Sequence, residues 1–258
     1  MDETSTAVGD EDNRVIKVVR KPSQTDAAVD LIRSKIIDLS VPPGSRIDER
    51  LLIDQFKLGR TPAREAINRL QAEGLVNIVP DRGGKYVREL DMREIGEILA
   101  AHQVAEGMLA SLCNFDAPTL VEDLKKIQER YAQSVAARNY LDITEINQAF
   151  HLRMFQSINN TFLFEFAQSI HRHVRRLLVM MYKLESKTPR IQSEQFEANV
   201  SQHWQIIDLI EKRDRAELKS VLPDHAFHTQ KRLSAFLEMQ AKKGAEVEVL
   251  APGFPVPK

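Results

Sequence analysis

The sequence has little of several features that would narrow its class. It contains one cysteine, Cys113, so no disulfide can form within the chain, which fits a reducing compartment. No apolar run approaches the roughly 18 residues of a membrane-spanning helix. Residues 1–12 are acidic and polar, unlike the apolar stretch of a secretory signal. These absences predict a cytoplasmic protein.

The charges that are present are unevenly distributed. The whole chain of 258 residues carries a formal net charge of −1, and 43% of its residues are hydrophobic, which allows a real core in one large or two ordinary domains. Residues 14–90 hold 15 Lys or Arg against 10 Asp or Glu, a net of +5. A basic segment in an otherwise neutral chain indicates a polyanion as partner.

The N-terminal third predicts a winged helix-turn-helix domain over residues 25–89, after a disordered arm at 1–24. A first helix covers residues 25–38, with Thr25 as its N-cap, and Asp48 caps a short second helix that ends at Phe56. Thr61 and Pro62 open a third helix that ends near Glu73. Two short strands, 76–79 and 85–87, flank a glycine turn and form the wing.

Residues 90–240 predict a second, all-helical domain. Six helices with short loops form an antiparallel bundle, so the fold class is mostly α. Two capping boxes, Asp91 with Glu94 and Asp214 with Glu217, open the first and the last of these helices. Residues 241–258 are rich in proline and predict a flexible tail. The six segments are about 91–113, 116–138, 141–158, 161–186, 191–212 and 214–239.

The third helix of the N-terminal domain carries the candidate DNA contacts. Arg60, Thr61 and Arg64 lie at its N-terminal end, where free N–H groups and the helix dipole attract phosphate. Arginine also binds guanine through two hydrogen bonds in the major groove. In a winged helix-turn-helix this helix enters the major groove, and the wing lies near the backbone or minor groove.

The same region resembles the GntR family of bacterial regulators. The resemblance covers about residues 25–88 and implies that Arg50, Arg60, Thr61 and Arg64 contact DNA, with Gly84 of the wing approaching the groove. The residues that carry it are Pro42-Pro43-Gly44, Glu49-Arg50, Leu52, Arg60-Thr61-Pro62, Arg64-Glu65-Ala66-Ile67, Arg69-Leu70, Glu73-Gly74-Leu75-Val76, Gly83-Gly84 and Tyr86-Val87.

Histidines of the helical region form a candidate metal site. Asn147 and His151 are four residues apart on one face of the helix predicted at 141–158. His203 lies on the helix predicted at 191–212, and His225 lies on the one at 214–239. Three helices of a bundle can direct side chains to one interior point. Imidazole ligands with one open position suit Zn²⁺ or Ni²⁺ better than Mg²⁺ or Ca²⁺. The sequence therefore predicts a divalent metal, with Zn first and Ni or Mn as further choices.

Residues 91–240 resemble the sensor domain of the FadR-type branch of the same family, with the six helices of the VanR-like subgroup. That resemblance implies a homodimer, a pseudo-palindromic operator on double-stranded DNA, and a small organic anion as effector, with repression more common than activation. Two positions depart from the family pattern. Asn147 replaces an aspartate, which implies weaker metal binding but more attraction for an anion. His102 replaces an arginine that contacts the effector carboxylate.

Other readings of the histidines stay open. His171 and His173, beside three arginines, are predicted to lie on a solvated or pocket-edge face, and His228 near the site or in a structural role. A metal-dependent hydrolase would need a general base near the metal, and no His-Glu-x-x-His arrangement occurs, so the chain is not predicted to be an enzyme. A metal-free DNA-binding regulator is the alternative that the Asn147 exchange leaves open.

Overall fold

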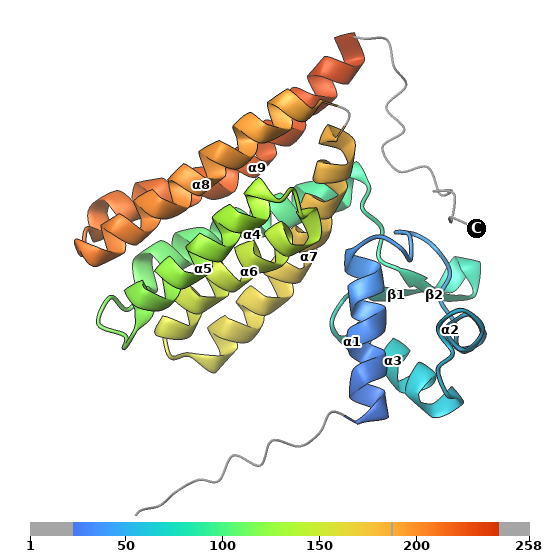
Figure 1. Cartoon of the computed structure of the whole chain (residues 1–258). Coiled ribbons are helices and arrows are strands. Elements are labelled where there is room, and N and C mark those ends of the chain that lie inside the picture. Colours follow the sequence, from blue (N-terminus) through green and yellow to red (C-terminus); the bar gives the residue numbers. More distant parts are fainter. Residues whose placement is uncertain (1–22, 187, 243–258) are drawn as a thin grey trace, which may run out of the picture.

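A computed structural model describes residues 23–186 and 188–242 of the chain (Figure 1). Within these ranges the chain folds into a small winged unit at the N-terminal end and a helical bundle behind it (Figure 1). Among the described helices, none is both long and apolar enough to cross a membrane.

The winged unit consists of three helices and a two-stranded antiparallel sheet. They are α1 (Gln24–Ile37), α2 (Glu49–Phe56), α3 (Arg60–Ala72), β1 (Val76–Val79) and β2 (Gly84–Val87). Val76 pairs with Val87 at one end of the sheet, and Val79 pairs with Gly84 at the other. The turn between the strands passes through Gly83 with φ of +59°, a left-handed conformation that glycine adopts without strain. This is the winged helix-turn-helix that the sequence predicts.

Two helices of this unit begin earlier than predicted. The N-cap of α1 is Ser23 rather than Thr25, because Ser23 and Asp26 exchange the two hydrogen bonds of a capping box. The N-cap of α3 is Gly59, so Thr61 lies inside the first turn instead of capping it. Pro62 fits there because the first N–H groups of a helix have no partner within it.

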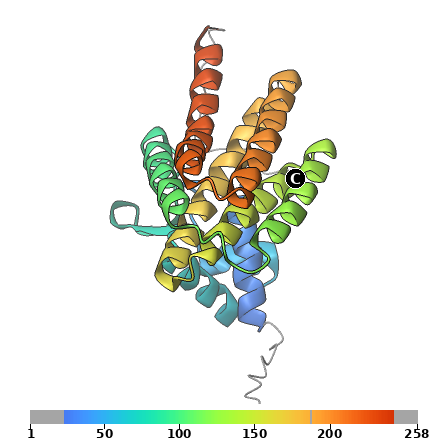
Figure 2. The same cartoon turned by 90° about the vertical axis from the view of Figure 1, so that its left-hand side faces the viewer.

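The bundle behind the winged unit contains six helices, as predicted. They are α4 (Met92–Leu112), α5 (Leu120–Ala136), α6 (Tyr140–Ser157), α7 (Thr161–Glu185), α8 (Pro189–Glu211) and α9 (Arg215–Lys242). The closest pairings are α4 with α9 and α5 with α6, and α8 lies beside α9 along one side of the bundle (Figures 1 and 2).

Several predicted boundaries in the bundle shift by a few residues. Asp91 caps α4 by accepting the N–H of Glu94, but the carboxylate of Glu94 binds Arg88 and does not complete a capping box. The helix α5 begins only at Leu120. The predicted arm at 1–24 and tail at 241–258 lie outside the described residues, apart from the N-cap Ser23, Gln24 in α1 and residues 241–242 in α9.

The interior of the bundle is divided into two apolar clusters. The proximal cluster, nearer the winged unit, includes Leu90, Ile98, Leu99, Ile143, Ile146, Val174, Leu177 and Leu233. The distal cluster includes Ala105, Leu109, Phe150, Met154, Ala167, Ile206 and Leu222. A layer of five buried histidines lies between them along the helices: His102, His151, His171, His203 and His225. The bundle core is therefore interrupted by one polar layer.

The helix α7 also joins the bundle to the winged unit, where it packs against α1 (Figure 1). Arg176 is fully buried and donates to the backbone carbonyl of Arg88 at the end of the wing. Lys183 Nζ donates to the carbonyl oxygen of Asp38 at 2.7 Å. Arg33 of α1 binds Glu73 with two hydrogen bonds of 2.8 and 2.6 Å, and Arg172 of α7 approaches the same carboxylate. Lys183, Arg176 and Arg172 thus connect α7 with the winged unit.

The core of the winged unit supplies a stability test. Ile32 of α1 is fully buried, whereas the neighbouring Leu31 is 37% exposed. Ile32→Ala should lower the free energy of unfolding by about 2–5 kcal/mol, and Leu31→Ala by less than about 1 kcal/mol. Denaturant unfolding of the full chain, followed by circular dichroism, measures both losses. Equal losses for the two variants would contradict this packing.

Candidate metal centre and DNA-binding surface

The side chains of the predicted DNA contacts on α2 and α3 are exposed. The side chain of Arg50 is 92% exposed with only a 3.6 Å approach to Asp54, and that of Arg60 is 86% exposed with a 3.9 Å approach to Glu49. Thr61 and Arg64 are exposed on the first turns of α3. These weak, solvated ion pairs leave both arginines available to phosphate or base edges.

A groove of about 180 Å³ connects α3 with the wing, and its lining includes Arg64, Gly84 and Lys85. Sequence reasoning overlooked a further member of this lining, Arg46. Arg46 pairs with Tyr86 as an isolated bridge beside β2, and its side chain is 62% exposed. Its place in a proline-rich turn gave no sign of this, because the pairing with the wing is a tertiary contact.

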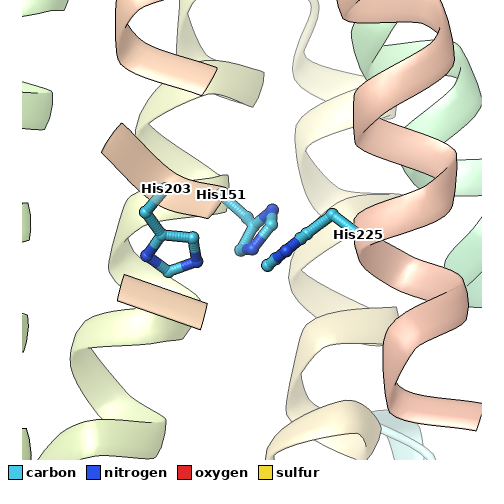
Figure 3. Close-up of side chains that lie close together, drawn as sticks. All are labelled: His151, His203 and His225. Atoms are coloured by element: carbon cyan, nitrogen blue, oxygen red, sulfur yellow. The ribbon is translucent and has the colours of Figure 1, made fainter. Parts of the chain in front are cut away.

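Three of the predicted metal ligands come together in the bundle. His151 of α6, His203 of α8 and His225 of α9 point toward one another (Figure 3). Each offers a ring nitrogen, and these nitrogens all lie within 4.8 Å of one another. His151 and His203 are fully buried and His225 is 6% exposed. The structure thus assembles from three helices the imidazole set that the sequence suggested.

A second layer of side chains holds the three rings. Nδ1 of His151 lies 2.9 Å from Glu106 Oε2, Nδ1 of His203 lies 2.8 Å from Gln128 Oε1, and Nδ1 of His225 lies 2.9 Å from Gln202 Oε1. Nε2 of His151 and of His203 are buried without a hydrogen-bond partner. Metal-binding histidines characteristically use one nitrogen for an oxygen acceptor and the other for the ion.

The protonation of these rings suits cation binding. Burial in the bundle holds the pKa of His203 and that of His225 well below the usual range, with repulsion from neighbouring histidines in the same direction. His203 and His225 are therefore neutral, and a neutral imidazole keeps a lone pair for a metal. Asn147 is buried one turn before His151 on α6. That Asn147 acts as a ligand stays a prediction.

A second buried cluster lies beside this one, and sequence reasoning missed two of its members. His102 and Glu106 of α4 and His171 of α7 offer ligand atoms that are all within 4.8 Å of one another. Burial alone would raise the pKa of Glu106, but the adjacent His151 and His171 hold it well below its usual range. Burial also lowers the pKa of His102 to about 3. That His102 contacts an effector stays a prediction.

The predicted exposure of His171 and His173 is wrong. His171 is 1% exposed and His173 is 8% exposed. The reason is that α7 packs against two partners. His171 faces the interior of the bundle. Nε2 of His173 lies 3.5 Å from the position that a Cβ atom would occupy if Gly74 of the winged unit carried a side chain. The spacing of Ala167, His171 and Val174 on one helical face could have indicated the burial of His171. His228 is half-buried and belongs to neither cluster.

Comparison with known families agrees with the two-part fold. Residues 24–86 match the family described as bacterial regulatory proteins, gntR family, and residues 97–227, half of the chain, match the FCD domain. The chain belongs to the GntR family. It is a transcription regulator with a DNA-binding winged helix-turn-helix and a helical FCD domain, and not an enzyme, so the hydrolase alternative is set aside.

Similar proteins span most of the chain. The gluconate operon transcriptional repressor of Bacillus licheniformis is 26% identical over 84% of this chain and 88% of its own. The transcriptional repressor RspR of Escherichia coli is 24% identical over 76% of this chain and 82% of its own. Among solved structures, Escherichia coli McbR/YncC has a TM-score of 0.63 at 19% identity, over 84% of this chain and 98% of that one. A GntR regulator of Rhodococcus sp. RHA1 has a TM-score of 0.64 at 18% identity, over 82% and 98%. Because the sequence identities are below 25%, these two structures show only that the chain shares their fold.

The geometry around His203 predicts which ring nitrogen carries the proton. The amide group of Gln128 donates to the carbonyl of Val200 at 3.1 Å, so its oxygen must face His203 Nδ1. The metal-free protein should therefore hold His203 with the proton on Nδ1. Long-range proton–nitrogen correlation spectra distinguish the two tautomers. Gln128→Leu, which lacks the acceptor, should lose this preference, and a proton on Nε2 in the unchanged protein would contradict the assignment.

Proposed function

We propose that this regulator holds a divalent metal ion on His151, His203 and His225, and that a small organic anion at the open position of the ion controls its binding to DNA. The observation that carries the proposal is the convergence of three buried rings whose Nδ1 atoms are already engaged by oxygen acceptors. A buried nitrogen without a partner costs free energy, and a cation would satisfy it.

The ion that fits this donor set is Zn²⁺, because imidazole ligands suit it and tetrahedral coordination leaves a fourth position. Ni²⁺ and Mn²⁺ are the further choices. Three imidazole ligands, with the amide of Asn147 as a further ligand in a five-coordinate shell, bring no negative charge, so the ion keeps its double positive charge and one open position. This charge favours an anionic effector. The gluconate operon repressor of Bacillus licheniformis supports an organic acid, and its name also supports repression. His102, which replaces the family arginine, is proposed to contact the effector.

For the DNA contacts we propose that α3 enters the major groove with Arg60, Thr61 and Arg64 at its N-terminal end. Arg50 binds the phosphate backbone, and Gly84 brings the wing close to the groove. The exposure of these residues and the groove shared by Arg64 and Gly84 support the assignment. A homodimer would place two such helices on a pseudo-palindromic operator. The cytoplasmic location stays a prediction.

The helix α7 provides a physical route from the ion to DNA. His171 lies in the polar layer, and Arg172, His173 and Arg176 on the same helix touch the winged unit. An effector that favours one tilt of α7 would therefore move the attached winged unit. In a dimer this changes the spacing of the two DNA-reading helices, which is a two-state change that a ligand can bias.

The DNA assignment predicts a loss of affinity for Arg64→Ala. The variant should bind an operator duplex, selected from a random pool, more weakly by about 1–3 kcal/mol, because it loses a base or phosphate contact. Arg130→Ala, which removes an exposed arginine on α5, is the control and should bind like the unchanged protein. Fluorescence anisotropy measures both affinities. Unchanged binding by Arg64→Ala would remove this residue from the interface.

The metal assignment predicts a gain for Asn147→Asp. An anionic ligand in place of the amide should tighten Zn²⁺ binding by at least about tenfold, because a unit charge within about 4 Å of a doubly charged ion contributes about 2 kcal/mol or more, and a tenfold change needs only about 1.4 kcal/mol. Gln148→Asp, with the same change of charge at the next position, is the control. Calorimetric titration with Zn²⁺ compares the three proteins. Equal gains for both variants would exclude Asn147 as a ligand. A protein that binds no Zn²⁺, Ni²⁺ or Mn²⁺ would be the metal-free regulator.

A further inference from the structure

The second buried cluster, His102, Glu106 and His171, has the geometry of a ligand set of its own. His171 Nε2 lies 3.2 Å from Glu106 Oε1, and His102 Nε2 lies 3.8 Å from the same oxygen. Two ligand atoms on a tetrahedral Zn²⁺ ion, each about 2.0–2.2 Å from the metal, are separated by about 3.4 Å. The two measured separations lie on either side of that value. An ion therefore fits among the three side chains with small adjustments.

These ligand atoms are also without other partners. Four buried atoms of this cluster form no hydrogen bond: both ring nitrogens of His102, Nε2 of His171 and Oε1 of Glu106. The distance between His171 Nε2 and Glu106 Oε1 is 3.2 Å. His102 is 4% exposed, His171 is 1% exposed and Glu106 is fully buried. Each such atom would cost roughly 1–3 kcal/mol if it stayed unsatisfied. A cation would satisfy one atom from each side chain and offset the buried carboxylate charge.

We propose that His102, Glu106 and His171 bind a second divalent cation, so that the polar layer holds two ions. Two imidazoles and one carboxylate with open positions form a ligand set that Zn²⁺ and Fe²⁺ accept in proteins. The proposal shares Glu106 with the three-histidine site of the proposed function and His102 with its effector contact, but it does not require an ion on the three histidines.

The shared residue is Glu106, whose two oxygens have different roles. Oε2 holds Nδ1 of His151 at 2.9 Å, and Oε1 faces His102 and His171. An ion on Oε1 draws negative charge away from Oε2 and from the His151 ring. The ring then gives its lone pair less strongly to the ion at the three-histidine site. The two ions are therefore coupled, and the same factor links the affinities in both directions. We expect the protein to fill its two sites in separate steps.

The test is the number of Zn²⁺ ions bound by the full chain. The protein, freed of metal by dialysis against a chelator, is titrated with Zn²⁺ in a calorimeter, and bound zinc is counted by elemental analysis. We expect two equivalents per chain. His171→Asn and His102→Asn should each bind one, as should His203→Asn, which lacks a ligand of the first site. His173→Asn is the matched control on α7 and should still bind two.

The outcomes separate this proposal from the proposed function. One equivalent that disappears in His203→Asn but persists in His171→Asn would overturn the second site. One equivalent that disappears in His171→Asn but persists in His203→Asn would support the second site and overturn the first. No bound zinc in the unchanged protein would overturn both. If His171→Asn does not fold, His102→Asn and the stoichiometry of the unchanged protein still decide the question.

The Glu106→Gln variant tests the shared carboxylate. The amide keeps an oxygen for His151 but lacks the negative charge. We expect Glu106→Gln to lose the second equivalent and to bind the first about 10- to 100-fold more weakly, as for other changes in residues that hold a ligand. A variant that binds two equivalents with unchanged affinities would contradict a role of Glu106 in either site.

Discussion

The structure depends on a layer of imidazoles buried between two apolar clusters of one helical bundle. Apolar packing cannot satisfy a polar atom there, so the buried ring nitrogens need specific partners. The protein supplies partners for three Nδ1 atoms through Gln128, Gln202 and Glu106, and each of the five rings offers one nitrogen to one of two groups of candidate ligands. The apolar residues of the surrounding helices pack on both sides of this layer. The proximal and distal clusters therefore determine where along the bundle the five histidines lie.

The helix α7 has two partners, and its sequence reflects both. One face carries apolar residues and His171 into the bundle, whereas Arg172, His173 and Arg176 turn toward the winged unit. Arg176 is fully buried, and its contact with the carbonyl of Arg88 lies at the chain segment that joins the two units. The polar layer and the DNA-binding face are therefore positioned by the same rigid element. A single helix can transmit small displacements between them because packed interiors deform little.

Much of this could be predicted from the sequence, because local rules decide it. Apolar periodicity gave the helices to within a few residues, and helical spacing together with the order of helices was enough to bring His151, His203 and His225 together. The burial of His171 and the part of Glu106 could not be predicted in the same way. Both depend on which face of one helix meets another, and a row of arginines beside His171 suggested solvent where a second domain packs. Comparison with the family established the class of protein but not these contacts.

The bonds between α7 and the winged unit limit how this winged unit could be joined to the bundle of another regulator. A chimera that joins this winged unit to the bundle of a relative at residue 90 would keep the chain continuous. It would nevertheless leave Glu73 without Arg172, and the carbonyls of Arg88 and Asp38 without their donors from α7. Such a hybrid would keep the fold of the winged unit but lose the bonds that join it to α7. The winged unit and the face of α7 that carries Arg172, His173 and Arg176 therefore form one packing unit, although the chain assigns them to different domains.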